Sequence, residues 1–183
     1  MSERSGTPSK RRGPSGLRLG SVFGIEVRLD ASIVLIFALI VVSLAESLFP
    51  SWHPDWSRLL TWATATGAAV VFFASLLAHE LSHSLMARRR GIEVPRITLF
   101  VFGGMAELSA EPKDPRSELY IAIVGPLASL VLGIVFAVLG AMLTPATFTE
   151  TMMANPERAI AHLGPLATIC VWLAPVNVAL AVF

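Results

Sequence analysis

Charged residues are scarce in this sequence: Asp, Glu, Lys and Arg make up 15% of its 183 residues, whereas 54% are apolar. A soluble domain carries about 25% charged residues, so this composition excludes an ordinary water-exposed surface. Cysteine is almost absent as well, with Cys170 as the single example. One cysteine excludes an internal disulfide framework and a zinc site built from several thiolates. The composition therefore predicts a membrane protein.

Four apolar stretches are long enough to cross a membrane. They lie at about Ala31–Phe49, Leu59–Ala87, Leu119–Leu143 and Leu163–Phe183. A helix needs about 20 residues to cross the hydrocarbon core of a bilayer. The polar segment before the first stretch is about 30 residues long, which is too long for the leading part of a signal peptide. The sequence predicts an all-α polytopic membrane protein with about four transmembrane helices.

The positive charges are distributed unevenly between the connecting segments. Of the 14 Lys and Arg residues, all but Arg58 and Arg158 lie before the first apolar stretch or between the second and third. Cytoplasmic loops carry an excess of Lys and Arg. This asymmetry predicts a multi-pass protein of the cell membrane, with its N-terminus and its middle loop in the cytoplasm.

The segments outside the apolar stretches differ in character. Residues 1–20 are rich in Ser, Gly, Pro, Lys and Arg and are expected to form a disordered basic tail. The next segment, Ser21–Leu29, alternates weakly between apolar and polar residues and suggests a short strand.

In the middle loop, Ile97–Met105 combines β-branched and aromatic residues with a glycine pair. This predicts a short re-entrant β-hairpin that turns near Gly103 and Gly104. An amphipathic loop packed on the helices is the alternative, and the sequence alone does not separate the two.

The second apolar stretch contains the sequence His79-Glu80-Leu81-Ser82-His83. Residues four apart lie on one face of a helix, so both imidazoles can reach one metal ion. Glu80 lies one step round the helix, where it can hold a water molecule. Zinc lowers the pKa of such a water to near 7, and the carboxylate takes its proton as the oxygen attacks a carbonyl.

The position of this motif in the membrane strengthens the metal interpretation. Three ionisable groups in one turn of a bilayer span are costly unless they have a function. The alternative is a pair of histidines that are hydrogen-bonded in the bundle core, with Glu80 paired to one of them. Counted back from Arg88, the motif lies roughly 8–14 Å inside the basic end of the span. A hydrolytic site there needs water access and a substrate that is itself in the bilayer.

Several motifs together resemble the site-2 protease family of intramembrane zinc metalloproteases. They are Ala78–Ser84, Ala87–Ile92, Phe102–Leu108 and Gly125–Leu127, in the order and spacing of that family. The segment around Phe23–Ile25 is similar to the subgroup that often carries a C-terminal pair of CBS domains. The likeness covers about residues 17–183.

The resemblance implies the activity and the site. It implies a domain over residues 21–183 that binds one Zn²⁺ per chain through His79 and His83, with Glu80 as the catalytic general base. The expected partners are the lipid bilayer and a membrane-embedded protein substrate, and no nucleic acid. A transmembrane substrate must unwind before hydrolysis, and an edge strand can hold the unwound segment. The resemblance assigns this substrate-binding role to Phe102, Gly103 and Gly104.

One part of the family pattern is missing. The third zinc ligand of the family is an aspartate in an Asn-x-x-Pro…Leu-Asp-Gly motif, which does not occur before Phe183. The sequence is therefore expected to be C-terminally incomplete and to lack activity as it stands. Among the acids on the cytoplasmic side, Asp30, Glu107 and Asp114 are conceivable substitutes, although none has a favoured spacing. The missing ligand also leaves open a catalytically inactive membrane module that binds transmembrane clients.

Two further features have simpler interpretations. His53 and His162 lie on the outer side and are expected to be solvated loop histidines. Gly125 and Pro126 are expected to kink the third span, with a role in the active site as the less favoured alternative.

Overall fold

The structure is a computed structural model that describes residues 16–101, 103–112, 114–144 and 148–182. Four long apolar helical segments form its framework, and each is long enough to cross a membrane. The first consists of α1 (Ser32–Ser43), a π-helical turn η1 (Leu44–Leu48) and α2 (Phe49–Trp52). The other three are α3 (Arg58–Arg89), α4 (Pro115–Leu143) and α7 (Pro165–Val182). The predicted helical membrane fold with four spans is confirmed.

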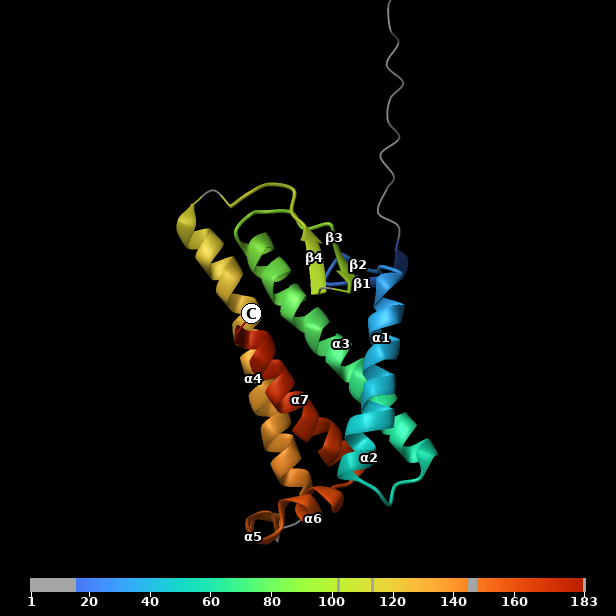
Figure 1. The fold of residues 1–183 in the computed structure, drawn as a ribbon. Coiled ribbons are helices and arrows are strands. Elements are labelled where there is room, and N and C mark those ends of the chain that lie inside the picture. Colours follow the sequence, from blue (N-terminus) through green and yellow to red (C-terminus); the bar gives the residue numbers. More distant parts are fainter. Residues whose placement is uncertain (1–15, 102, 113, 145–147, 183) are drawn as a thin grey trace, which may run out of the picture.

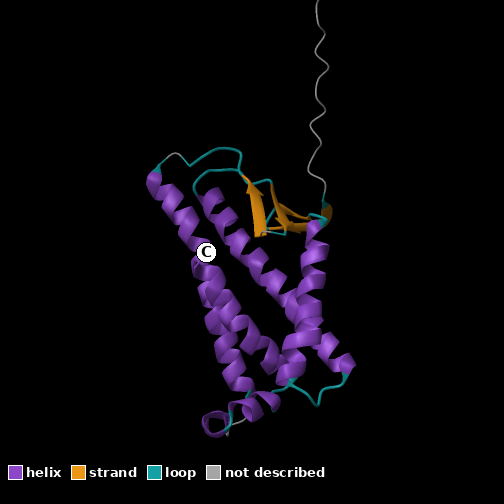
Figure 2. Cartoon of the chain, viewed as in Figure 1, coloured by secondary structure: helices purple, strands orange, loops and turns teal. Residues whose placement is uncertain are grey.

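A small sheet lies at one end of the bundle, beside the ends of two of the helices, α1 and α3 (Figure 2). Its four strands follow the order β1-β2-β3-β4 and have these bounds: Leu17–Val22, Ile25–Leu29, Arg96–Phe100 and Gly103–Glu107. The two hairpins β1–β2 and β3–β4 are antiparallel, and β2 pairs with β3 in parallel. The sheet therefore joins two segments that lie on either side of two membrane spans in the sequence.

The sheet corrects three details of the expectation. The middle-loop hairpin exists, but it turns between Phe100 and Gly103, so the glycine pair begins β4 instead of forming the turn. The segment before the first span forms a hairpin and not a single strand, and its turn places Phe23 at φ 52°. Strand β1 also begins at Leu17, inside the range that was expected to belong to the disordered tail.

The sheet is held on the helices by an apolar cluster. Ile25 of β2 and Ile97 and Leu99 of β3 pack together with Ile33 of α1 and Leu81 of α3. Burying side chains of this size stabilises the arrangement by about 1.5–3 kcal/mol each. Since Leu81 lies within the histidine motif, the same cluster fixes the sheet beside that motif.

The helix ends follow from local sequence. Ser57 caps α3 by accepting a hydrogen bond from the amide of Leu60, and Asp114 caps α4 by accepting one from the amide of Ser117. After α3 the chain leaves the helix through Gly91 at φ 80°, a conformation that favours glycine. The sheet, the end of α3 and the start of α4 lie at one end of the bundle. The short helices α5 (Phe148–Ala154) and α6 (Pro156–Ala161) lie at the other (Figure 1).

Helices α4 and α7 pack closely and run in opposite directions. A side chain at Gly140 would lie 3.4 Å from Cβ of Cys170, and one at Gly133 would lie 3.0 Å from Cγ2 of Val178. Small residues let two helix backbones approach within a membrane. The C-terminal end of α7 accordingly lies beside the middle of α4 (Figure 1).

Candidate metal centre

The two histidines of the motif face one another on α3. Their Nε2 atoms are 3.0 Å apart, and their ring centroids are separated by 4.8 Å. His79 and His83 are one helical turn apart, which places both side chains over the same stretch of the helix surface. The structure therefore brings the two predicted ligands together.

Helix α4 holds the opposite nitrogen of each ring. Nδ1 of His79 lies 2.8 Å from the hydroxyl oxygen of Ser129, and Nδ1 of His83 lies 2.6 Å from the carbonyl oxygen of Ile121. A carbonyl only accepts hydrogen bonds, so Nδ1 of His83 carries the hydrogen and the neutral ring has its lone pair on Nε2. Such second partners orient the ring of a metal-binding histidine and raise its basicity.

Gly125 brings the backbone of α4 against the ring of His83. A Cβ atom at this position would lie 2.1 Å from Nε2 and 2.5 Å from Cε1 of that ring. A side chain at this position would force the ring or α4 to shift, so glycine allows α4 to pack this closely on His83. The sequence favoured a kink at Gly125 and Pro126 over a role in the active site, whereas this contact places Gly125 at the candidate site. The signal in the sequence was the family motif Gly125–Leu127.

Glu80 is held from the side of the sheet. The backbone of Gly104 lies against this side chain, and a Cβ atom built at Gly104 would be 3.1 Å from Oε1 of Glu80. A Cβ atom at Gly104 would lie 2.2 Å from Cγ of Glu80. Glycine is thus required for β4 to approach α3 so closely. Gly103 precedes it at φ 131°, and the third residue of the expected substrate-binding set, Phe102, lies outside the described residues.

The acids considered as a third ligand are engaged elsewhere. Asp30 accepts a hydrogen bond from the amide of Ser32 at the start of α1, and Asp114 caps α4. Glu107 forms an ion pair with Arg96 at 3.5 Å. Within the part of the chain that the structure describes, no group of three His, Cys, Asp or Glu side chains is placed to hold a metal ion. The two histidines therefore form a partial site.

This partial site fits zinc. Two nitrogens that each lie 2.0–2.1 Å from a tetrahedral zinc ion are about 3.3 Å apart, close to the 3.0 Å between the two Nε2 atoms. The bare Nε2 of His83 faces Nε2 of His79, so its lone pair is available to an ion held by both rings. Imidazole is a common zinc ligand, so the donor type fits as well.

His53, at the opposite end of the bundle, has a different environment from the one expected. It is buried, with 2% of its surface exposed, and its ring stacks on Trp56 with the centroids 3.8 Å apart. Its Nδ1 lies 3.3 Å from the carbonyl oxygen of Ala161, and its Nε2 lies 2.8 Å from the hydroxyl oxygen of Thr168. The prediction of a solvated histidine is wrong here, because the loop folds back onto the segment that leads into α7. His162, by contrast, is exposed as predicted.

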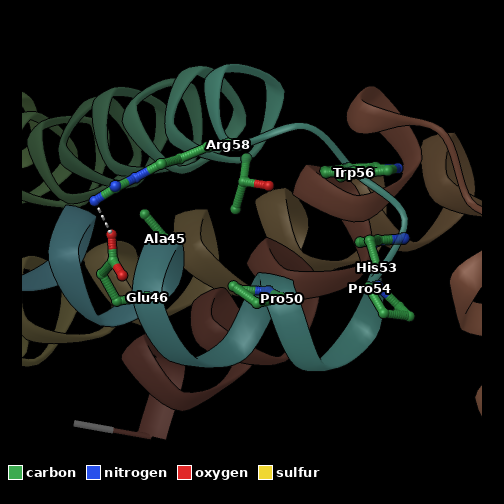
Figure 3. A pocket seen from close by; sticks show the side chains of 8 residues that line it. Ala45, Glu46, Pro50, His53, Pro54, Trp56 and Arg58 are labelled. Carbon is green, nitrogen blue, oxygen red and sulfur yellow. Dashed lines mark hydrogen bonds and ion pairs between the residues drawn. The ribbon is translucent and has the colours of Figure 1, made fainter.

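The surroundings of His53 form a small cavity of about 340 Å³ (Figure 3). Glu46 and Arg58 are among its lining residues and form an ion pair at 3.3 Å. Glu46 also accepts a hydrogen bond from the indole N–H of Trp62 at 3.0 Å. Burial lowers the pKa of His53, although its contact with the carbonyl of Ala161 acts in the opposite direction. This end of the molecule thus has polar side chains that are paired with each other or with backbone.

Known proteins share both the sequence and the fold of this chain. Residues 67–183 match Peptidase family M50. A candidate zinc metalloprotease of Synechocystis sp., sll0528, is 37% identical over 92% of this chain and 40% of its own length. A candidate zinc metalloprotease of Mycobacterium tuberculosis, Rip3, is 35% identical over 90% of this chain and 38% of its own length. The solved structure of a site-2 protease from Methanocaldococcus jannaschii superposes with a TM-score of 0.59 at 26% identity, covering 92% of this chain and 63% of that one.

Proposed function

Because the chain belongs to peptidase family M50, the family of site-2 proteases, we propose that it is the metal-binding part of an intramembrane zinc endopeptidase. The proposed reaction is hydrolysis of peptide bonds within transmembrane segments of membrane-protein substrates. The observation that carries the proposal is the pair of Nε2 atoms 3.0 Å apart within a candidate membrane span, with Glu80 beside them.

His79 and His83 are the residues that would hold the zinc ion. When bound, zinc supplies a Lewis acid and lowers the pKa of a water molecule to near 7. The second partners on α4, Ser129 and the carbonyl of Ile121, keep both rings directed toward the shared side. The chain's contribution is thus a pair of oriented ligands within a candidate membrane span.

Glu80 acts as the general base in this proposal. Its carboxylate accepts a proton from the attacking water as the oxygen forms a bond to the substrate carbonyl carbon. It then gives that proton to the nitrogen of the leaving amine when the C–N bond breaks. The backbone of Gly104 packs against the Glu80 side chain and keeps it between the sheet and α3.

The exposed edge of β4 is the proposed substrate-binding strand. Among the described strands, β4 stands last in the sheet and pairs only with β3. An unwound substrate segment could pair its backbone with this edge, which would satisfy the peptide groups released from the substrate helix. Gly103 and Gly104 would allow that backbone to approach, and Phe102 completes the proposed set.

The proposed third ligand would come from a segment that continues from α7. The curated relatives are more than twice as long as the stretch they share with this chain. Helix α7 runs antiparallel to α4, passing Gly140 at Cys170 and Gly133 at Val178. Gly125 lies about two helical turns further in the same direction. A segment continuing from α7 would therefore arrive beside Gly125, next to His83.

The orientation in the membrane is part of the proposal. The structure has the start of α1 and the segment between α3 and α4 at the same end of the bundle (Figure 1). The excess of Lys and Arg at that end supports a cytoplasmic location for it. Single-cysteine labelling in a Cys170→Ser background tests this: Arg116→Cys should react from the cytoplasm and Asp55→Cys from the opposite side. The reverse labelling pattern would contradict the orientation.

The decisive experiment for the activity uses Glu80→Gln in the full-length protein. Glutamine keeps the shape of the side chain but does not accept the proton, so cleavage of a transmembrane reporter substrate should fall by at least about 100-fold. Bound zinc should remain, because Glu80 is not a ligand. Glu46→Gln at the other end of the bundle is the matched control and should cleave normally.

Two outcomes would overturn the proposal. A Glu80→Gln protein that cleaves at the wild-type rate would show that Glu80 is not the general base. A full-length wild-type protein that binds no zinc and cleaves nothing would instead favour a module that only binds transmembrane clients.

A further inference from the structure

A continuous chain of short polar contacts runs from α4 through both histidines and back to α4. The hydroxyl oxygen of Ser129 lies 2.8 Å from Nδ1 of His79, and Nε2 of His79 lies 3.0 Å from Nε2 of His83. Nδ1 of His83 then lies 2.6 Å from the carbonyl oxygen of Ile121. Each link joins two atoms that can share one hydrogen, so the positions of the hydrogens along the chain depend on each other.

The carbonyl of Ile121 determines the first of these positions. It only accepts, so the hydrogen of neutral His83 lies on Nδ1 and its Nε2 is bare. Two bare nitrogens 3.0 Å apart repel each other, so either a hydrogen or a cation must lie between them. In the first case the hydrogen belongs to Nε2 of His79. Nδ1 of His79 is then bare and accepts the hydrogen of the Ser129 hydroxyl.

With a cation between the rings, the arrangement at His79 reverses. Both Nε2 atoms must now offer lone pairs, so the hydrogen of neutral His79 lies on Nδ1 and is donated to the oxygen of Ser129. A serine hydroxyl can serve in both states because it is a donor and an acceptor. Helical serines commonly turn their hydroxyl to the carbonyl four residues back, as Ser75 does with Val71 at 3.0 Å. Ser129 has the same option toward the carbonyl of Gly125.

We propose that Ser129 is a positioning residue that supports His79 in either neutral tautomer, so that the site is stable before metal loading and oriented after it. The inference rests on the proposed zinc site. It assigns to Ser129 a role that a fixed acceptor such as a carbonyl does not perform. Loading then needs only a change of tautomer at His79, with no change in the charge of the two rings.

The location of Ser129 supports this role. The residue is fully buried in α4, with 0% of its surface exposed, so water does not replace its hydroxyl. Removing the hydroxyl would leave Nδ1 of His79 without this partner. Second partners of metal-binding histidines typically change metal affinity by 10–100-fold.

The first test compares zinc affinity in full-length proteins by competition with a chelator. Ser129→Ala should weaken zinc binding by about 10–100-fold, and Ser129→Thr should restore most of the loss because it keeps the hydroxyl. Ser75→Ala is the matched control, since Ser75 is also buried in a spanning helix and bonds only its own helix in the described structure. It should bind zinc like the wild type. Equal affinity in Ser129→Ala and the wild type would overturn the inference.

The second test needs no variant and reads the tautomer directly. ¹⁵N NMR of labelled histidine should place the hydrogen of His79 on Nε2 in zinc-depleted wild type and on Nδ1 after zinc is added. A hydrogen on Nδ1 in both states would overturn the inference even if the variants fail to fold. A wild type that takes up no zinc would instead overturn the proposed function, so the two failures are distinguishable.

Discussion

The two ends of the bundle both contain histidines packed between helices, yet they use the ring nitrogens differently. At the sheet end, His79 and His83 direct their Nδ1 atoms to α4 and their Nε2 atoms to each other. At the opposite end, His53 has both nitrogens in contact with protein oxygens, those of Ala161 and Thr168. The first arrangement leaves a shared position for a ligand, and the second leaves none.

The comparison shows that burial alone does not make a histidine a metal ligand. His53 is the more deeply buried of the two cases, with 2% exposure, and its contacts join the loop after α2 to the start of α7. The sheet end differs because glycine backbone packs directly on the reactive side chains. Gly125 packs on His83, and Gly104 packs on Glu80. The contacts of His53 thus hold the loop after α2 against α7, whereas at the sheet end backbone packs directly against the side chains of His83 and Glu80.

Adding a side chain at Gly125 should have the largest effect on zinc binding and cleavage. Gly125→Ala would place a methyl group 2.1 Å from Nε2 of His83, so either the ring or α4 must move. Zinc affinity and cleavage by the full-length protein should both fall by about 100-fold or more, as expected when a ligand and its second partner are displaced together. Gly140→Ala in the same helix is the control, because its Cβ would lie 3.4 Å from Cys170, an ordinary contact. Wild-type zinc affinity in Gly125→Ala would show that the site is looser than described.

A substitution at His53 should change stability and not the metal. His53→Ala leaves the carbonyl of Ala161 and the hydroxyl of Thr168 with one partner fewer, and each lost buried hydrogen bond costs about 1–3 kcal/mol. The free energy of unfolding in detergent should therefore fall by at least the cost of one such bond. Zinc affinity should stay at the wild-type level. His162→Ala is the control, since His162 is exposed. Reduced zinc binding in His53→Ala would break the distinction between the two ends.

The smallest expected effect is in the pH dependence of stability. Burial lowers the pKa of His53, so the unfolded chain binds its proton more readily than the folded protein. Stability from this group is therefore present above the unfolded pKa of about 6.5 and is lost as pH falls through the folded pKa. Thermal unfolding between pH 7.5 and 5 should show a decline in the wild type that is shallower in His53→Ala. Parallel profiles would mean that His53 does not contribute to the pH dependence of stability.

The sequence predicted the features that depend on local pattern. The four spans follow from apolar length, and the pairing of His79 with His83 follows from helical spacing. The parallel pairing of β2 with β3 was not predictable, because it joins segments separated by two spans and depends on an apolar cluster formed only in the folded chain. The same holds for the contacts of Ser129 and His53, since each partner lies on another helix or loop and neither spacing nor composition indicates it.

The zinc content of full-length histidine variants, measured by elemental analysis after purification, tests the central claim most directly. The wild type and His53→Ala should each retain about one zinc ion per chain, whereas His79→Ala and His83→Ala should each lose it, because a catalytic zinc site normally needs three protein ligands. Zinc retained in both His79→Ala and His83→Ala, or lost from His53→Ala, would contradict the assignment of the metal site to the sheet end of the bundle.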